Sequence, residues 1–221
     1  MFSSNLDNNL MITDEFKVSN DLILTANGIN LKQRSYPFSD ISEIYLLVSN
    51  VKVNFVSMGN DYTFYLALLD GNSIEINSGK LFSKNVSLEN VSKCYSYLAS
   101  KTLVSRRNLY LNQLENEGYF DYQPNEVRIY KNGDVNRKGK TVNLKKAASE
   151  GKIYFGVERG VPGTAYYSAD PNKIIIFEKS RFLSLTKGKL SFKCLVNRDV
   201  IIPILKTMAY TKSSFKLYRS K

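Results

Sequence analysis

Basic side chains are the most concentrated chemical feature of this sequence. The segment from Arg128 to Lys152 carries eight lysines and arginines against two acids, Asp134 and Glu150. Clustered ammonium and guanidinium groups bind phosphate oxygens through charge-assisted hydrogen bonds, and each is worth about 1 kcal/mol beside an anionic leaflet. The predicted anion-binding residues are Lys131, Arg137, Lys138, Lys140, Lys145 and Lys146. The competing interpretation is a basic hairpin face that is only solvated.

The positive charge is confined to one half of the chain. Residues 1–118 hold 10 Lys+Arg and 12 Asp+Glu, whereas residues 119–221 hold 21 and 8, so the net charge of +11 arises entirely in the second half. Such asymmetry suggests an anionic partner, although a basic surface also keeps a protein soluble. Near the end of the chain, basic residues alternate with Tyr210, Phe215 and Tyr218. This pattern suits a nucleic acid or a membrane surface, and it is equally typical of a frayed terminus.

The composition argues against catalysis. The chain has no histidine, which excludes Ser-His and Cys-His nucleophile pairs and every metal site that needs a histidine ligand. Its two cysteines, Cys94 and Cys194, cannot form a four-thiolate metal site within one chain, and both lie in apolar stretches that favour core packing. We therefore expect a protein that is not an enzyme, with no catalytic residues, no metal and no cofactor.

The cysteine content and the apolar runs also indicate in which cellular compartment the protein resides. Two cysteines 100 residues apart do not resemble a disulfide-stapled secreted scaffold, and the first residues lack the basic and apolar regions of a secretory signal. The longest apolar runs fall far short of the roughly 20 residues that a membrane-spanning helix requires. We expect a cytoplasmic protein, peripheral to a membrane if its basic half binds lipid.

The chain reads as a duplicated unit. Residues 20–28 and 125–133 both begin with Asn and an acid, place apolar residues at the same positions, and end in Asn-Gly. Asn-Gly between strand-like runs predicts a hairpin with a type I′ turn, which needs positive φ at both central residues. A second pair of similar segments, Tyr65–Ile76 and Phe182–Lys193, predicts turns at Asp70-Gly71 and Lys187-Gly188.

Each half then ends in a predicted amphipathic helix. Ser87 is the expected N-cap of the first helix, which continues through residues 106–117 as a connector and ends at Gly118. Asp199 is the expected N-cap of the second, with Pro203 in its first turn. The apolar stripes are Leu88, Val91, Tyr95 and Leu98 in the first helix, and Ile201, Ile204, Leu205, Met208 and Ala209 in the second. The predicted strands are 43–48, 51–57 and 62–69, then 152–158, 165–168, 173–178 and 182–186.

These elements predict a mainly β fold. We expect two tandem small antiparallel β-barrel or sandwich units, each closed by a C-terminal amphipathic helix. The first unit would cover residues 17–118, including the extended connector helix. The second, basic unit would cover residues 119–212, with a basic tail at 213–221.

The order of elements resembles the pleckstrin-homology-like (PH-like) barrel, and its bacterial members most of all. The resemblance rests on Asn27-Gly28 followed by Phe38-Ser-Asp-Ile41, and on Asn132-Gly133 followed by Val142-Asn-Leu144, and it would span residues 17–105 and 119–212. PH-like domains that bind inositol phosphates use basic residues on and after their first hairpin. The resemblance therefore implies roles for Lys131, Arg137, Lys138 and Lys140, whereas the matching hairpin of the first half holds only Lys32 and Arg34. The alternative is an unrelated pair of β-sandwich-like units.

The sequence thus predicts a non-enzymatic binding or assembly module, in which the basic second unit engages an anionic surface such as phospholipid headgroups. One alternative is a protein–protein adaptor that uses an exposed sheet edge and the tyrosines Tyr119, Tyr122, Tyr166 and Tyr167. A second alternative is a nucleic-acid-binding protein, for which strong salt dependence without headgroup preference would be diagnostic.

Overall fold

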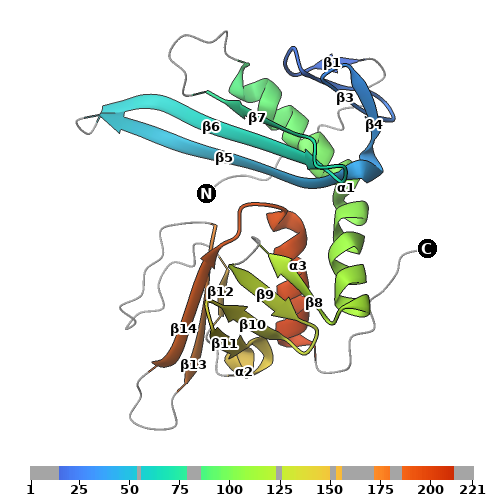
Figure 1. Cartoon of the computed structure of the whole chain (residues 1–221). Coiled ribbons are helices and arrows are strands. Elements are labelled where there is room, and N and C mark those ends of the chain that lie inside the picture. Colours follow the sequence, from blue (N-terminus) through green and yellow to red (C-terminus); the bar gives the residue numbers. More distant parts are fainter. Residues whose placement is uncertain are drawn as a thin grey trace. The chain divides into compact units, whose positions relative to one another are not determined.

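A computed structural model describes residues 15–53, 56–78, 86–122, 126–149, 153–155, 172–179 and 186–211. The chain divides into two compact units, Met1–Arg106 and Arg107–Lys221. The helix α1 (Leu88–Asn116) runs through this division, so the boundary lies within it, earlier than the predicted boundary after Gly118. Figure 1 shows the elements of both units along the chain.

The first unit contains two antiparallel sheets and the N-terminal part of α1. Its four-stranded sheet has the order β1-β2-β3-β4, and a short 3-10 helix, η1 (Phe38–Asp40), leads into a three-stranded sheet of order β5-β6-β7. The strands are β1 (Phe16–Lys17), β2 (Leu22–Leu24), β3 (Gly28–Leu31), β4 (Arg34–Pro37), β5 (Ile41–Val53), β6 (Val56–Leu68) and β7 (Ser73–Asn77).

Helix α1 begins and ends where the sequence predicts. The Ser87 hydroxyl accepts a hydrogen bond from the Asn90 amide at 3.1 Å, which satisfies one of the free amides of the first turn. Gly118, with φ of +79°, follows the last turn in the left-handed conformation that commonly stops a helix. The predicted stripe is buried at Val91 and Leu98, which pack with Cys94 against Leu24 and other apolar residues of the sheets.

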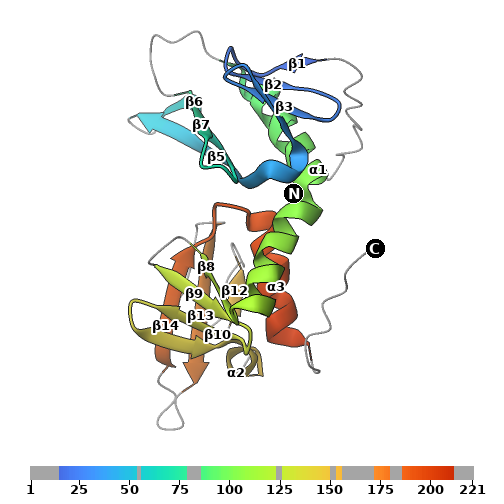
Figure 2. The ribbon, with the colours of Figure 1, turned by 45° about the vertical axis from the view of Figure 1, so that its right-hand side comes forward.

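The second unit repeats this arrangement with one added helix (Figure 2). A four-stranded sheet of order β11-β10-β9-β8 is followed by α2 (Leu144–Ser149), a three-stranded sheet of order β12-β13-β14, and α3 (Arg198–Tyr210). The strands are β8 (Tyr119–Tyr122), β9 (Val127–Tyr130), β10 (Asp134–Arg137), β11 (Lys140–Asn143), β12 (Ile153–Phe155), β13 (Lys173–Lys179) and β14 (Thr186–Lys193). The predicted stripe of α3 is buried from Ile201 to Ala209 at each of its five positions.

The broad class, mainly β with helices, is confirmed. In both units a four-stranded meander precedes a three-stranded meander and a helix, and the hairpins β3–β4 and β10–β11 both close with two-residue turns of positive φ, Lys32-Gln33 and Lys138-Gly139. The predicted barrels are not confirmed, because the described strands form four open sheets. No helix in the described part of the chain is long and apolar enough to cross a membrane.

The Asn-Gly hairpins form, but the predicted type I′ turn is wrong in both. Neither Asn27 nor Gly28 has positive φ, and in the second unit only Gly133 does, at +90°. The Gly133 amide donates to the Tyr130 carbonyl at 2.9 Å, so this hairpin has a three-residue loop with a left-handed glycine at its end. Gly28 is required for a different reason, because β3 passes so close to β4 that a Cβ would overlap the Tyr36 carbonyl.

Three other local predictions are also wrong. Residues Lys187-Gly188 lie inside β14 instead of forming a turn, since Glu178 of β13 pairs with Lys187. The predicted strand 51–57 is divided between two strands, since residues 51–53 belong to β5 and residues 56–57 belong to β6. Helix α3 begins two residues earlier than expected, because its N-cap is Asn197 instead of Asp199, and Pro203 therefore lies beyond the first turn. The predicted strand 165–168 lies outside the described residues.

We predict that Gly28→Ala destabilises the protein much more than Gly71→Ala. The added methyl at residue 28 meets backbone atoms of Tyr36 and Pro37, which cannot move without separating β3 from β4, so the free energy of unfolding should fall by about 2–3 kcal/mol. Gly71 has open space around it and only its φ of +86° opposes a side chain, for a cost of about 1 kcal/mol. Urea denaturation of both variants measures the difference, and equal losses would contradict the close approach of the two strands.

Candidate functional site

The candidate site is the outer face of the β8–β11 sheet. Successive residues of a strand point to opposite faces, and Phe120, Ile129 and Val135 from three neighbouring strands are fully buried on the inner face. The residues between them therefore face outward, so Arg128 lies between its cross-strand neighbours Asp121 and Asn136.

Arg128 is held by a carboxylate and by an aromatic ring. Its Nε donates to Asp121 Oδ1 at 2.7 Å and its Nη2 donates to Oδ2 at 2.9 Å. Its guanidinium carbon also lies 4.1 Å from the centroid of the Tyr119 ring. The hydrogen bonds and charge of Arg128 lower the pKa of Asp121 below its usual value, and the hydrogen bonds and charge of Asp121 raise the pKa of Arg128. The side chain is therefore fixed in place and its charge is largely balanced.

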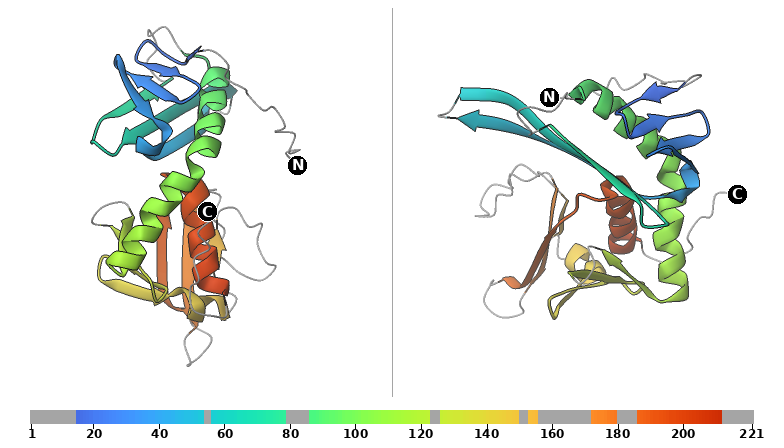
Figure 3. Two further views of the ribbon diagram at one scale, coloured as in Figure 1. Left: turned by 90° about the vertical axis from the view of Figure 1, so that its right-hand side faces the viewer. Right: turned by 45° about the horizontal axis from the view of Figure 1, so that its top comes forward.

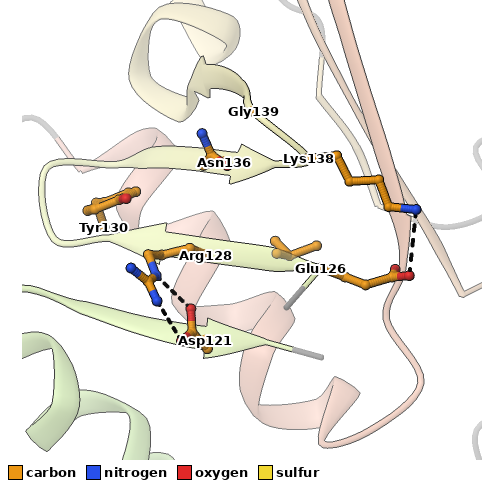
Figure 4. Close-up of a pocket in the computed structure, with 8 residues that line it drawn as sticks. Asp121, Glu126, Arg128, Tyr130, Asn136, Lys138 and Gly139 are labelled. Carbon is orange, nitrogen blue, oxygen red and sulfur yellow. Dashed lines mark hydrogen bonds and ion pairs between the residues drawn. The ribbon is translucent and has the colours of Figure 1, made fainter. Parts of the chain in front are cut away.

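An open pocket of about 350 Å³ lies on this face (Figure 4). Its charged side chains are two carboxylates, Asp121 and Glu126, and two cations, Arg128 and Lys138, each cation drawn toward one carboxylate in the figure. Val127, Tyr130, Asn136 and Gly139 complete the lining. A pocket with balanced charge does not provide the excess of donors that would hold a phosphate group.

Arg137, one of the predicted anion-binding residues, makes its contacts within the protein. Its Nη1 donates to the Ser191 carbonyl in β14, and its Nη2 lies 3.0 Å from Glu126 Oε2. The Lys138 ammonium is 3.9 Å from the other oxygen of Glu126. Glu126 therefore offsets the charge of two predicted residues, and Arg137 links the two sheets of the second unit.

The six predicted residues do not form one cluster. Lys131 lies in the turn before β10, whereas Lys138 lies in the turn after it, and the four residues of β10 separate these ends by about 13 Å. Asn143 pairs with Asp134, so helix α2, which follows Asn143, begins at the Lys131 end. The first turn group is Lys131, Lys145 and Lys146, and the second turn group is Arg137, Lys138 and Lys140.

Hydrogen bonds hold the backbone of the first turn group in place. The Asn132 and Asn143 amides donate to the two carboxylate oxygens of Asp134, at 2.8 and 2.7 Å. The Asn143 side-chain oxygen accepts from the Lys146 amide at 3.1 Å, which caps α2. Sequence reasoning missed this network, although Asn132-Gly-Asp134 and an Asn directly before a helix are both recognisable turn and cap signals.

Lys131 and Lys145 of the first turn group are more available than the arginines. Lys131, Lys145 and Lys146 are exposed, and so is Lys140 of the second turn group. Among the residues that the structure describes, no carboxylate lies within 4.0 Å of Lys131, Lys140 or Lys145. Asp134, the nearest acid in sequence to Lys131, already accepts from two amides, so Lys131 and Lys145 retain an excess of positive charge.

The predicted tyrosines and the basic tail either have structural roles or lie outside the described residues. The Tyr122 hydroxyl donates to the Val196 carbonyl at 3.2 Å inside the core, whereas Tyr166, Tyr167 and the tail 213–221 fall in parts of the chain that are not described. Both cysteines are buried, and burial raises the pKa of Cys194 to about 11 and raises that of Cys94 further. No group of three potential metal ligands forms within the described ranges.

We predict that Arg128→Gln raises the pKa of Asp121 toward that of an unperturbed aspartate. Because the native pKa lies below the unfolded one, the interaction stabilises the protein above the unfolded pKa, and this stabilisation is lost as the pH falls through the native value. NMR titration of the Asp121 carboxyl carbon measures the shift, with Lys131→Gln as the control that should leave it unchanged. An Asp121 pKa that does not respond to Arg128→Gln would show that the pair does not exist in solution.

Comparisons of the chain with protein-family models, with curated proteins and with solved structures found no match.

Proposed function

We propose that this chain is a non-enzymatic binding module of two PH-like units, whose second unit binds an anionic phospholipid surface at the cytoplasmic side of a membrane. The proposal rests on a difference in pairing between the arginines and the lysines of the second unit. Its arginines at the site are neutralised by Asp121 and Glu126, whereas Lys131, Lys140 and Lys145 are exposed without a described carboxylate partner.

The repeated order of elements supports the PH-like assignment. A four-stranded meander, a three-stranded meander and a C-terminal helix occur in each unit, and the β3–β4 and β10–β11 hairpins close with equivalent two-residue turns. The β10–β11 hairpin carries three basic residues and Asp134, whereas the β3–β4 hairpin carries Lys32 and Arg34, so the two hairpins have the same net charge. The additional positive charge of the second unit lies outside this hairpin, at residues such as Lys131 and Lys145.

The distribution of lysines favours a surface over a single headgroup. Lysine is a flexible point charge and does not form the planar two-bond contacts with phosphate that arginine forms, and the arginines here are already paired. Lysines at both ends of a four-residue strand reach phosphates that are well separated from each other. Such binding sums contributions of about 1 kcal/mol per lysine and weakens as salt screens the charges.

A protein–protein adaptor is the second candidate, and one observation favours it. Tyr119 and Arg128 stack on the outer sheet face, and Arg128 is 43% exposed. Tyrosine and arginine are enriched among the residues that dominate binding at protein interfaces, and a fixed pair loses little entropy on docking. This surface is balanced in charge, so binding there would depend little on salt.

We predict that the triple variant Lys131→Gln/Lys145→Gln/Lys146→Gln binds anionic vesicles about 100-fold more weakly than the unmodified protein. The measurement is cosedimentation with vesicles of phosphatidylcholine and phosphatidylserine across a salt series. The matched control is Lys17→Gln/Lys32→Gln/Arg34→Gln, which removes the same charge from the first unit and should leave binding unchanged.

Three results would contradict the proposal. Equal binding to pure phosphatidylcholine would show that charge is not involved, and equal losses in both triple variants would show that net charge alone matters. Tighter binding to single-stranded DNA than to anionic vesicles at the same salt concentration would favour the nucleic-acid alternative.

A further inference from the structure

The outer face of the β5–β6–β7 sheet carries aromatic and acidic side chains that the proposed function does not use. Phe64 and Leu66 of β6 are fully buried on the inner face, in the core to which α1 contributes Val91 and Leu98. In Figures 1 and 3, the N-terminal part of α1 runs along one side of this sheet. Residues that alternate with the buried ones point to the other side, so Tyr65 lies on the outer face.

Two tyrosines form the centre of this outer face. Tyr45 of β5 pairs directly with Tyr65 of β6, and both side chains are half-buried. Their ring centroids are 5.3 Å apart and the ring planes are inclined by 23°, so the rings are stacked with an offset. The offset leaves part of each ring face uncovered by the other ring. Because the face of an aromatic ring is its negative surface, the pair attracts a cation.

Two carboxylates lie beside the tyrosines. Glu43 precedes Tyr45 by two residues on the same face of β5, and Glu75 of β7 pairs directly with Tyr65. Burial and the charge of Glu43 raise the pKa of Tyr65, and burial and the charge of Glu75 raise that of Tyr45, so both carboxylates are close enough to act on the rings. Burial also raises the pKa of Glu43 itself, as happens when no cation offsets the loss of hydration.

No positive charge accompanies these groups in the described part of the chain. The strand segments that form the outer face, residues 43–49, 61–67 and 73–77, contain no lysine or arginine. Among the described residues, no cation lies within 4.0 Å of Glu43 or Glu75, and none lies over the ring of Tyr45 or Tyr65. The half-buried carboxylate of Glu43 therefore has no described partner that would offset its charge.

The second unit shows which side chain such a set of groups holds. There the Tyr119 ring and the Asp121 carboxylate both contact Arg128, whose guanidinium carbon is 4.1 Å from the ring centroid and whose nitrogens donate to both carboxylate oxygens. A planar guanidinium can stack on a ring and donate to a carboxylate at the same time, whereas a lysine ammonium is a compact point charge. The outer face in the first unit offers the same two kinds of group without an arginine of its own.

We propose that the outer face of the β5–β6–β7 sheet binds an arginine side chain of a partner protein, with the guanidinium against the Tyr45–Tyr65 pair and hydrogen-bonded to Glu43. Arginine is favoured over a quaternary ammonium group, which has no N–H to donate to the carboxylate. A protein is favoured as the source because these groups lie side by side on a sheet face, and tyrosine and arginine dominate binding between protein surfaces. The two units then have separate ligands of opposite charge.

A titration of the full chain tests the proposal. The probes are a capped hexapeptide of alternating glycine and arginine, the same peptide with lysine in place of arginine, and choline chloride, each followed by NMR of the tyrosine ring signals. The arginine peptide should shift the signals of Tyr45 and Tyr65 in a saturable manner, and it should bind about threefold or more tightly than the lysine peptide. Choline should cause no saturable shift.

Paired variants distinguish this site from general attraction between charges. Glu43→Gln/Glu75→Gln removes two negative charges at nearly constant shape and should weaken binding of the arginine peptide about tenfold. The matched control is Glu15→Gln/Asp21→Asn, which removes the same charge from exposed positions of the first unit outside this sheet and should leave binding unchanged. Circular dichroism confirms that each variant is folded.

Three outcomes would overturn the proposal. The first is no saturable shift at Tyr45 and Tyr65, and the second is an equal loss of binding in the two paired variants, which would show that only total charge matters. The third is binding of choline or of the lysine peptide as tight as that of the arginine peptide, which would indicate a site for cations in general. Vesicle binding by the second unit uses different residues, so its success or failure does not change these readouts.

Discussion

The need to cover the apolar face of small open sheets governs the structure of both units. Each unit has a four-stranded and a three-stranded sheet, and neither sheet can bury its apolar face alone. Helix α1 contributes Val91 and Leu98 to the first core and Leu111 and Leu114 to the second, where α3 also packs. One 29-residue helix therefore supplies apolar side chains to two cores, which explains why it continues well past the end of its first amphipathic stripe.

The same constraint determines which groups are left for binding. Phe120, Ile129 and Val135 fill inner positions of β8, β9 and β10, so Asp121 and Arg128, which alternate with them, face outward and lie opposite each other across the sheet. Opposite charges at neighbouring positions then pair, as Arg128 does with Asp121. Lys131 lies in a turn and Lys145 lies in α2, and neither has a described carboxylate within 4.0 Å. The arginines that stabilise the fold therefore lie within strands, whereas these two lysines lie outside them.

Sequence patterns predicted what depends on local periodicity. The stripes of α1 and α3, the Ser87 cap and the positions of the Asn-Gly hairpins could all be identified, because each requires residues only a few positions apart. The turn conformations were predicted wrongly because they depend on contacts with a neighbouring strand. Gly28 is an example, since it lies against the backbone of Tyr36. The placement of the six predicted anion-binding residues could not be derived for a similar reason, since Arg137 binds Ser191, 54 residues away, and a strand separates Lys131 from Lys138.

The most direct test of the account is lysine acetylation followed by mass spectrometry, with the protein bound to anionic vesicles and with neutral vesicles as the reference. If the first turn group forms the binding surface, Lys131, Lys145 and Lys146 should be protected by anionic vesicles alone, and Lys32 of the first unit should be acetylated equally in both samples. Unchanged acetylation of the first turn group, or protection centred on the first unit, would contradict the account.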